Sequence, residues 1–313
     1  MMNPLDSLLG RLAVRVAPRV SEQLSAKLVG LLERHVNDTV LPEAQRRAEA
    51  IFSDHPNTAS TAQYVSQAGG PFGPVPRSFR MVPEALRCCE ALAPEEELAR
   101  VLALRSIFRT GDYPDPWMND IVRAFRLMRG ARTYMEIGTF DRGNLAYAST
   151  LLSEDAVIVG VDIRDDPAQD QKLRNFLKPS QTYLPIIGDS RLPSTFASVK
   201  DALQGRRVDA VFIDGDHAAH SVLCDYTNSE ELVQDDGVIL FHDSVWEGDA
   251  HYKGVADTLA EINTVDPVYL IDAINPPWRF TRPLWKDEFW GVVGVVLASE
   301  QRWRQAPMSS KPA

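Results

Sequence analysis

The sequence predicts an α/β fold with a mostly parallel sheet, preceded by an N-terminal helical segment. Near the N-terminus, apolar residues recur at helical spacing. After Gly130, five short β-rich runs alternate with longer helical or polar stretches, which is typical of βα units that build a parallel sheet. Two later β-rich runs lack a strong helical pattern between them, so we expect them to pair as an antiparallel hairpin at one sheet edge.

Residues 1–110 are predicted to form a helical arm or lid followed by a loop. The helical spacing runs from Leu5 to His35, and Pro18 and Pro42 mark breaks. Its mixed charges favour packing on the rest of the chain or on a second subunit over a role at a membrane surface. We therefore expect a homo-oligomer that forms through the N-terminal helices.

A loop and two more helices are expected before the sheet. Glycine and proline cluster between Ala59 and Pro83, which predicts a loop. One helix is expected from about Glu84 to Arg109, and the next over Pro116 to Arg129. Residues 111–300 are then predicted to form the functional domain, and residues 301–313 a polar tail.

The five strands of the predicted parallel sheet each end in polar residues. The runs begin at Thr133, Val157, Thr182, Val208 and Gly237, and the two later runs begin at Val268 and Trp290. In open α/β sheets, ligands bind outside the carboxyl ends of the strands, near the point where the strand order reverses. The residues that end the strands are therefore the candidate site.

Composition excludes several classes of protein. The chain has 313 residues and a formal net charge of −10, which argues against non-specific binding to nucleic acid. No apolar run approaches the roughly 20 residues that span a bilayer. The three cysteines have no metal or redox spacing, so a reducing cytoplasm fits best. We expect a soluble protein with a small-molecule substrate, no nucleic-acid partner and no membrane.

The turn after the first strand, EIGTFDRGN, favours a positively charged ligand. Glu136 and Asp141 would oppose the pyrophosphate of a dinucleotide but suit S-adenosylmethionine, which carries a sulfonium and an ammonium cation. Asp162, after the second strand, is placed to accept hydrogen bonds from ribose hydroxyls, although nicotinamide enzymes share this feature and a helix N-cap is the simpler explanation. Asp189 would accept from the adenine amino group, with help from Ser190.

The fourth and fifth strands end in a dense group of possible metal ligands. FIDGDH ends in Asp214, Asp216 and His217, and ILFHD ends in His242 and Asp243. Adjacent parallel strands would bring both groups to one rim, where carboxylates around a divalent cation lower the pKa of a bound hydroxyl. Asp216 or His217 would then take the proton. In the simpler alternative, Asp214 contacts the cofactor and the others cap local structure.

Aromatic residues and two further histidines are weaker candidates. Trp278, Phe280, Trp285 and Trp290 lie between the last two strands and would wall the acceptor pocket, or else pack in the core or at a subunit contact. A solvated position is sufficient to explain His220 and His251, so neither is assigned to the site.

Five motifs, EIGTFDRGN, GVDI, IIGDS, FIDGDH and DDGVILFHD, occur in this order, and together they resemble the class I S-adenosylmethionine-dependent methyltransferases. The resemblance is closest to the branch of macrocin-type and mycinamicin-type sugar O-methyltransferases and cephalosporin hydroxylase-like proteins, and covers Tyr134 to Ser299. It implies a Rossmann-like, seven-stranded, mostly parallel sheet whose last strand is antiparallel.

The resemblance also implies roles for individual residues. Asp214 and Asp243 would be metal ligands, and Asp216 or His217 the base. His242 stands where metal-dependent relatives carry Asp or Glu, and it is the third predicted ligand. Its imidazole would shift the metal preference from magnesium toward manganese, iron or zinc. The residues predicted to bind the cofactor are Glu136, Gly138, Thr139, Gly143, Asp162, Asp189, Ser190 and Asp214.

One residue departs from the family pattern within the first motif. Arg142 stands where relatives have another glycine, which would crowd the methionine end of the cofactor or shift the turn by one residue.

The expected function is methyl transfer from S-adenosylmethionine to a hydroxyl of a small metabolite, a sugar or natural product, assisted by a divalent metal (magnesium or manganese). Two alternatives stay open at this point. One is a nicotinamide-dependent oxidoreductase that uses Asp162 on the ribose, and the other is a non-catalytic protein that binds S-adenosylmethionine.

Overall fold

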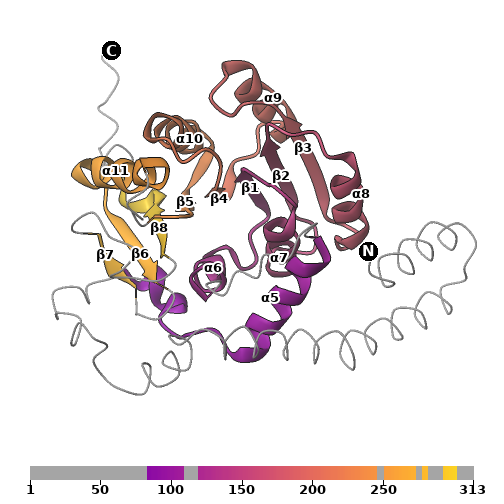
Figure 1. Cartoon of the computed structure of the whole chain (residues 1–313), viewed down its shortest axis with the longest axis horizontal. Coiled ribbons are helices and arrows are strands. Elements are labelled where there is room, and N and C mark those ends of the chain that lie inside the picture. Colours follow the sequence, from indigo (N-terminus) through magenta and orange to yellow (C-terminus); the bar gives the residue numbers. More distant parts are fainter. Residues whose placement is uncertain (1–82, 109–118, 245–249, 273–276, 281–291, 302–313) are drawn as a thin grey trace, which may run out of the picture.

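The fold is taken from a computed structural model, shown in Figure 1, which describes residues 83–108, 119–244, 250–272, 277–280 and 292–301. The predicted N-terminal arm lies outside these residues, as does all of the predicted loop except Pro83 and all of the tail except Gln301. The homo-oligomer expected from the arm therefore stays a prediction. Within the described parts of the chain, no helix combines the length and apolar character needed to cross a membrane.

In the described parts of the chain, one sheet of eight strands forms the central layer. Its strand order is β3-β2-β1-β4-β5-β8-β6-β7. The strands are β1 Thr133–Ile137, β2 Val157–Asp162, β3 Thr182–Ile187, β4 Val208–Ile213, β5 Val233–Phe241, β6 Val268–Asp272, β7 Trp278–Arg279 and β8 Val292–Leu297.

The predicted run of five parallel strands is confirmed. β1 pairs in parallel with β2 on one side and β4 on the other, and β3 and β5 extend the sheet outward. The edge strand β3 contains Pro185, a residue that sheets tolerate at an edge because it has no amide proton to donate. All five residues of the central strand β1 are buried, as expected for a strand covered on both faces.

The predicted antiparallel pairing of the last two runs, β6 and β8, is confirmed, but neither of them is the edge strand. β8 pairs antiparallel with both β5 and β6, so it lies inside the sheet. The edge is formed by β7, a two-residue strand that pairs with β6 and raises the strand number from the expected seven to eight. Every residue of β8 is buried, because Val and Leu occupy both of its faces.

Helices cover both faces of the sheet (Figure 1). One face packs against a 3-10 helix, α5, α6, α7 and α8, and the other against α9, α10 and α11. The helices are the 3-10 helix Glu84–Cys89, α5 Glu95–Phe108, α6 Asn119–Phe125, α7 Gly143–Leu151, α8 Pro167–Phe176, α9 Pro193–Leu203, α10 Ala219–Leu232 and α11 Ala250–Val265, with 3-10 turns Arg126–Met128 and Ala298–Glu300.

Three predicted boundaries are corrected. The helix expected from Glu84 to Arg109 is broken before α5, where Pro94 interrupts the helical hydrogen bonds. The helix expected to reach Arg129 ends as α6 at Phe125 and tightens into a 3-10 turn. β5 begins at Val233 rather than Gly237, because Val233 already pairs with Val208; residues 234–236, of which Asp235 and Asp236 are exposed, form a bulge that shifts the register against β4.

The strand order reverses between β1 and β4. From β1 the chain moves outward through β2 to β3, and then returns to β4 on the other side of β1. A crevice is expected at the carboxyl ends of these two strands, where the loops that follow them diverge. The candidate residues at the ends of β1, β2, β4 and β5 border this rim.

Candidate functional site

The loop after β1 lies directly against the end of β4. The amide of Asp214 donates to the carbonyl of Ile137 at 2.8 Å. Gly138 has φ +85°, and a Cβ at this position would lie 2.1 Å from the carbonyl oxygen of Asp214. The glycine is therefore required both by its backbone conformation and by the close approach of the two strand ends.

Asp162, at the end of β2, holds this loop. Its Oδ2 accepts from the amides of Thr139 and Phe140 at 2.9 and 2.8 Å and from the Thr139 hydroxyl at 3.2 Å. Its Oδ1 accepts from the amide of Arg164 at 2.8 Å. The carboxylate predicted to contact ribose thus also fixes the backbone of the glycine-containing loop, through charge-assisted hydrogen bonds.

Arg142 takes the backbone conformation that glycine prefers, with φ +68°. Its buried guanidinium donates to Asp170 of α8 at 2.8 Å and to the carbonyl of Phe140 at 2.6 Å. α7 begins directly afterwards at Gly143, whose amide donates to Asp141. The arginine is therefore accommodated by a partner on α8, and it ties the loop to that helix.

Glu136 is a buried carboxyl on β1, next to the loop. Burial raises its pKa to about 8 because the charged form loses hydration, and the hydrogen bond from Tyr134 opposes this shift. The Tyr134 hydroxyl donates to Glu136 at 2.8 Å, and the negative charge of Asp214 adds to the upward shift. The carboxyl is thus placed where a nearby cation would favour its ionised form.

Sequence reasoning missed Asn144, in the first turn of α7. Its side chain is buried, and its Oδ1 has no hydrogen-bond partner among the residues that the structure describes. A buried acceptor of this kind costs free energy unless a ligand or water satisfies it. Its place directly after Gly143 was the only signal in the sequence.

Asp189 and Ser190, after β3, have partners that the sequence did not predict. Arg191 binds both carboxylate oxygens of Asp189, at 2.6 and 2.9 Å, and this contact lowers the pKa of Asp189 to about 2. The Ser190 side chain acts to lower the pKa of the buried Asp225 of α10. Burial raises the pKa of Asp225 to about 7, and the charges of Asp189 and Asp216 add to the shift.

The ends of β4 and β5 meet, as predicted, in a cluster of acids and histidines. His242 Nδ1 lies 2.9 Å from Asp214 Oδ1 and 3.3 Å from Asp243 Oδ2. His217 Nε2 lies 3.4 Å from Asp243 Oδ2 and 3.9 Å from Asp214 Oδ1. One ligand atom each from Asp214, His217 and Asp243 falls within 4.8 Å of the other two, a spacing that would suit a metal ion.

Opposite charges dominate the electrostatics of this cluster. Burial alone would lower the pKa of His242, but the charges of Asp214 and Asp243 and their hydrogen bonds raise it well above 6.5. Burial alone would raise the pKa of Asp214, but His242 and His217 bring it down to about 2. The carboxylates are thus ionised at neutral pH and His242 is protonated, so a metal ion that takes His242 as a ligand has to displace its proton.

The backbone near the cluster is strained and closely packed. Asp243 has φ +49°, an uncommon conformation for a residue with a side chain that often marks a functional site. A Cβ on Gly254 of α11 would lie 2.1 Å from the carbonyl oxygen of His217, so α11 presses directly on the loop after β4. The loop that carries His217 is thereby held between β4 and α11.

Asp216 lies beside the cluster but has other contacts. Its Oδ1 accepts from the amide of Ala218 at 3.2 Å, and its Oδ2 from the Ser221 hydroxyl at 2.7 Å. Arg191 lies 3.7 Å from the same carboxylate. Asp216 therefore stabilises the start of α10, as a capping residue does.

The remaining candidates divide between the core, the surface and parts of the chain outside the description. Trp278 and Phe280 are buried in the hydrophobic core, which favours packing over a pocket wall. His220 is exposed and lies 3.3 Å from Arg191. Trp285 and Trp290 lie outside the described residues, as does the side chain of His251.

A family model described as a methyltransferase domain matches residues 135–244. The matched segment runs from β1 to just after β5, so it contains every strand end of the rim described above. None of the curated proteins compared with the chain matches its sequence.

Several solved structures are similar to this chain. The O-methyltransferase from Bacillus cereus in complex with SAH is 16% identical, covers 66% of this chain and 92% of its own, and has a TM-score of 0.45. TomG, an O-methyltransferase from Streptomyces achromogenes in complex with SAM, is 14% identical, with coverages of 66% and 91% and a TM-score of 0.44. Cofactor-bound Rv0187 from MTB is 15% identical, with coverages of 66% and 90% and a TM-score of 0.44. At these identities and TM-scores, the similarity carries no argument about activity.

The strand order, the glycine loop against β4 and the match over residues 135–244 thus support a class I S-adenosylmethionine-dependent methyltransferase, and they do not favour a nicotinamide enzyme.

Proposed function

We propose that this protein transfers the methyl group of S-adenosylmethionine to a hydroxyl of a small metabolite, such as a sugar or natural product, with the help of a divalent metal. The observation that supports this most is the group formed by Asp214, His217 and Asp243, which lies next to the glycine loop within the matched segment. If the cofactor and the acceptor are held side by side at this rim, their alignment alone would lower the barrier to methyl transfer by several kcal/mol.

The residues around the β1 loop fit a cationic nucleoside cofactor. Glu136 would face its ammonium group, and the Asn144 Oδ1, which has no partner among the described residues, would accept from the same group. Asp162 Oδ1 accepts one hydrogen bond, from the Arg164 amide, with the Arg164 guanidinium 3.7 Å away, and its second lone pair would accept from a ribose hydroxyl. The remaining proposed cofactor contacts are Gly138, Thr139, Gly143, Asp189, Ser190 and Asp214.

The ends of β4 and β5 fit a divalent metal. In this proposal Asp214, His242 and Asp243 hold the ion, a mixed oxygen and nitrogen donor set that suits manganese, iron or zinc better than magnesium. A cation held there would lower the pKa of an acceptor hydroxyl.

His217 is proposed as the general base rather than Asp216. The Asp216 carboxylate is occupied by the Ser221 hydroxyl and the Ala218 amide, whereas the His217 ring lies between the Asp214 and Asp243 carboxylates. A positioned base of this kind contributes roughly 10²–10⁴-fold to the rate.

Replacing the central carboxylate tests the proposal as a whole. Radiolabelled methyl transfer from S-adenosylmethionine to a panel of sugars, catechols and other hydroxyl compounds would be measured with added manganese. We expect product with the wild type and with the exposed control Asp155→Asn, and a loss of at least a hundredfold with Asp214→Asn. Equal turnover by Asp214→Asn and the wild type would refute the metal assignment.

Two histidine variants separate the ligand from the base. His242→Ala should lose bound manganese, measured by electron paramagnetic resonance of the folded protein, while His217→Ala should keep the metal and lose the rate. The opposite pattern would make His217 the ligand, as the spacing of Asp214, His217 and Asp243 also allows.

A further inference from the structure

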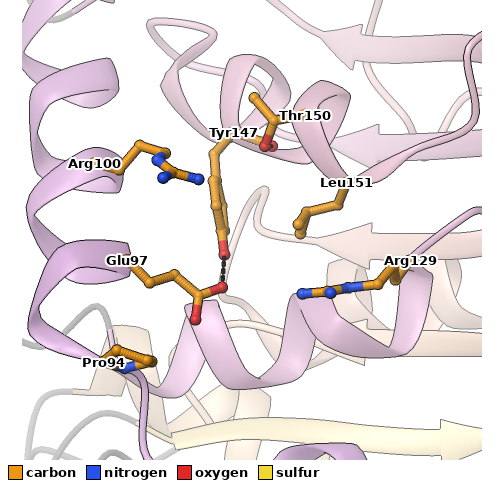
Figure 2. Close-up of a pocket in the computed structure, with 7 residues that line it drawn as sticks. All are labelled: Pro94, Glu97, Arg100, Arg129, Tyr147, Thr150 and Leu151. Carbon is orange, nitrogen blue, oxygen red and sulfur yellow. Dashed lines mark hydrogen bonds between the residues drawn. The ribbon is translucent and has the colours of Figure 1, made fainter. Parts of the chain in front are cut away.

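A hollow lies away from the candidate active site, between α5, α7 and the turn after α6 (Figure 2). Its volume is about 440 Å³, enough for a small organic molecule. The residues that line it are Pro94, Glu97, Arg100, Arg129, Tyr147, Thr150 and Leu151.

This hollow lies near the amino ends of the parallel strands, whereas the acidic residues of the candidate site lie at their carboxyl ends. α7 starts at the cofactor loop and runs back along the sheet, so its last residue, Leu151, lies near the start of β1. The Leu151 carbonyl accepts from the amide of Gly130 at 2.8 Å, and the amide of Ser153 donates to the carbonyl of Ala131 at 3.0 Å. A ligand bound there would not contact the proposed cofactor site.

The charge of the hollow is opposite to that of the whole chain. The formal net charge is −10, yet two arginines and one acid line the cavity. Glu97 is engaged by Arg126, 3.2 Å away. Arg100 and Arg129 are exposed, and neither makes an ion pair with another residue in the described parts of the chain.

The two cationic groups reach the hollow from different elements, and the Tyr147 ring forms an aromatic wall beside them. Figure 2 shows Arg100 extending from α5 toward the Tyr147 ring, and Arg129 entering from the other side. The Tyr147 ring stacks on Phe125 at 5.7 Å with an interplanar angle of 9°, and its hydroxyl donates to Glu97 at 3.4 Å. The wall is therefore held in place before any ligand arrives.

From this geometry we infer that the hollow binds a small organic anion, whose carboxylate or phosphate group is held by Arg100 and Arg129 and whose apolar part contacts Leu151. Guanidinium groups bind carboxylate and phosphate oxygens through paired, charge-assisted hydrogen bonds. The apolar surface of the half-buried Leu151 favours an anion with a short apolar body over a bare inorganic ion.

Calorimetric titration of the full chain with benzoate and with inorganic phosphate tests the inference. We expect benzoate to bind more tightly than phosphate, with an affinity that falls as sodium chloride is raised, since salt screens the partly exposed arginines. Arg100→Gln and Arg129→Gln should each weaken binding at least tenfold. Arg132→Gln is the matched control, because Arg132 lies near the same amino ends of the strands, pairs with exposed Asp155 and does not line the hollow.

The result is independent of the proposed methyl transfer. Arg129→Gln should bind S-adenosylhomocysteine with the same affinity as the wild type, since the hollow and the proposed cofactor site lie at opposite ends of the strands. Absence of binding by either anion up to millimolar concentration, or binding that neither arginine variant weakens, would overturn the inference. Tighter binding of phosphate than of benzoate would overturn the part that concerns the apolar body.

Discussion

At the scale of single residues, Glu136 links the site to pH. Its pKa is raised to about 8 by burial, so the carboxyl is largely protonated at pH 7 in the free protein. A ligand with an ammonium group binds the ionised form better, and must therefore displace this proton. We expect the affinity for a ligand with an ammonium group to rise by about tenfold per pH unit as the pH increases toward 8.

We predict that S-adenosylmethionine binds more tightly at pH 7.5 than at pH 6.0, and that Glu136→Gln removes this dependence. The range stays below the usual pKa of an α-amino group, about 7.7–8.0, so the ligand keeps its own charge. Calorimetric affinities of both proteins at four pH values test this. A parallel pH dependence in the variant would assign the effect to another group.

Asp225 gives a prediction about stability. Its pKa is raised from 3.8 to about 7 by burial, so its contribution to stability is present in full below pH 3.8 and is lost as the pH rises through 7. Asp225→Asn removes the carboxylate that must ionise in a buried position. Relative to the wild type, the free energy of unfolding of the variant should increase by on the order of a few kcal/mol as the pH is raised from 5 to 8.5.

Urea unfolding of Asp225→Asn and of the wild type across this pH range measures the difference. The exposed Asp155→Asn provides the control, because its partner Arg132 is equally exposed and such pairs contribute little. A stability difference that stays constant with pH would show that Asp225 does not titrate between pH 5 and 8.5.

Individual site residues were predictable from sequence only where the strand pattern placed them. Asp162, Asp214 and Asp243 were found because each ends a β-rich run, and the ends of parallel strands lie on one rim. The pairing of Asp189 with Arg191 and the contact of Arg142 with Asp170 were not found. Such contacts depend on side-chain directions, which periodicity does not encode.

At the scale of elements, the glycine loop after β1 is the most constrained connection in the site. Gly138→Ala would place a Cβ 2.1 Å from the Asp214 carbonyl, so β1 and β4 would have to separate. Gly130→Ala is a matched control, with φ +79° but no atom within 4 Å of the added Cβ. Both variants carry the strain of a positive φ, which costs on the order of 1 kcal/mol, and only Gly138→Ala adds the collision.

We expect Gly138→Ala to lower the melting temperature by several degrees more than Gly130→Ala, and to abolish binding of S-adenosylhomocysteine. Thermal unfolding followed by circular dichroism and calorimetric titration would show both effects. If the two variants melt together and both bind, the contact between the loop and β4 is not needed.

The order of the elements was predictable, whereas several of their boundaries were not. Five β-rich runs separated by helical stretches lead to a parallel sheet, because each helical crossover returns the chain to the end of the sheet at which the previous strand began. The break at Pro94, the bulge of residues 234–236 in β5 and the strand Trp278–Arg279 escaped prediction. Each depends on packing and pairing with distant residues, and local patterns contain little information about those.

At the scale of the whole molecule, the two ends of the parallel strands differ in chemistry. The carboxyl ends carry Glu136, Asp162, Asp214 and Asp243, and the hollow with Arg100 and Arg129 lies near the amino ends. The acidic end suits a cationic cofactor and a metal, and the basic hollow suits an anion. This division follows from the topology, because all five parallel strands point the same way.

Calorimetric titration of the wild type with S-adenosylmethionine and with NAD tests the central assignment most directly. The acidic residues around the β1 loop should bind the cationic nucleoside with one site per chain, and should show no heat of binding with the pyrophosphate-containing dinucleotide. Binding of NAD without binding of S-adenosylmethionine would contradict the assignment of this rim to a methyl donor.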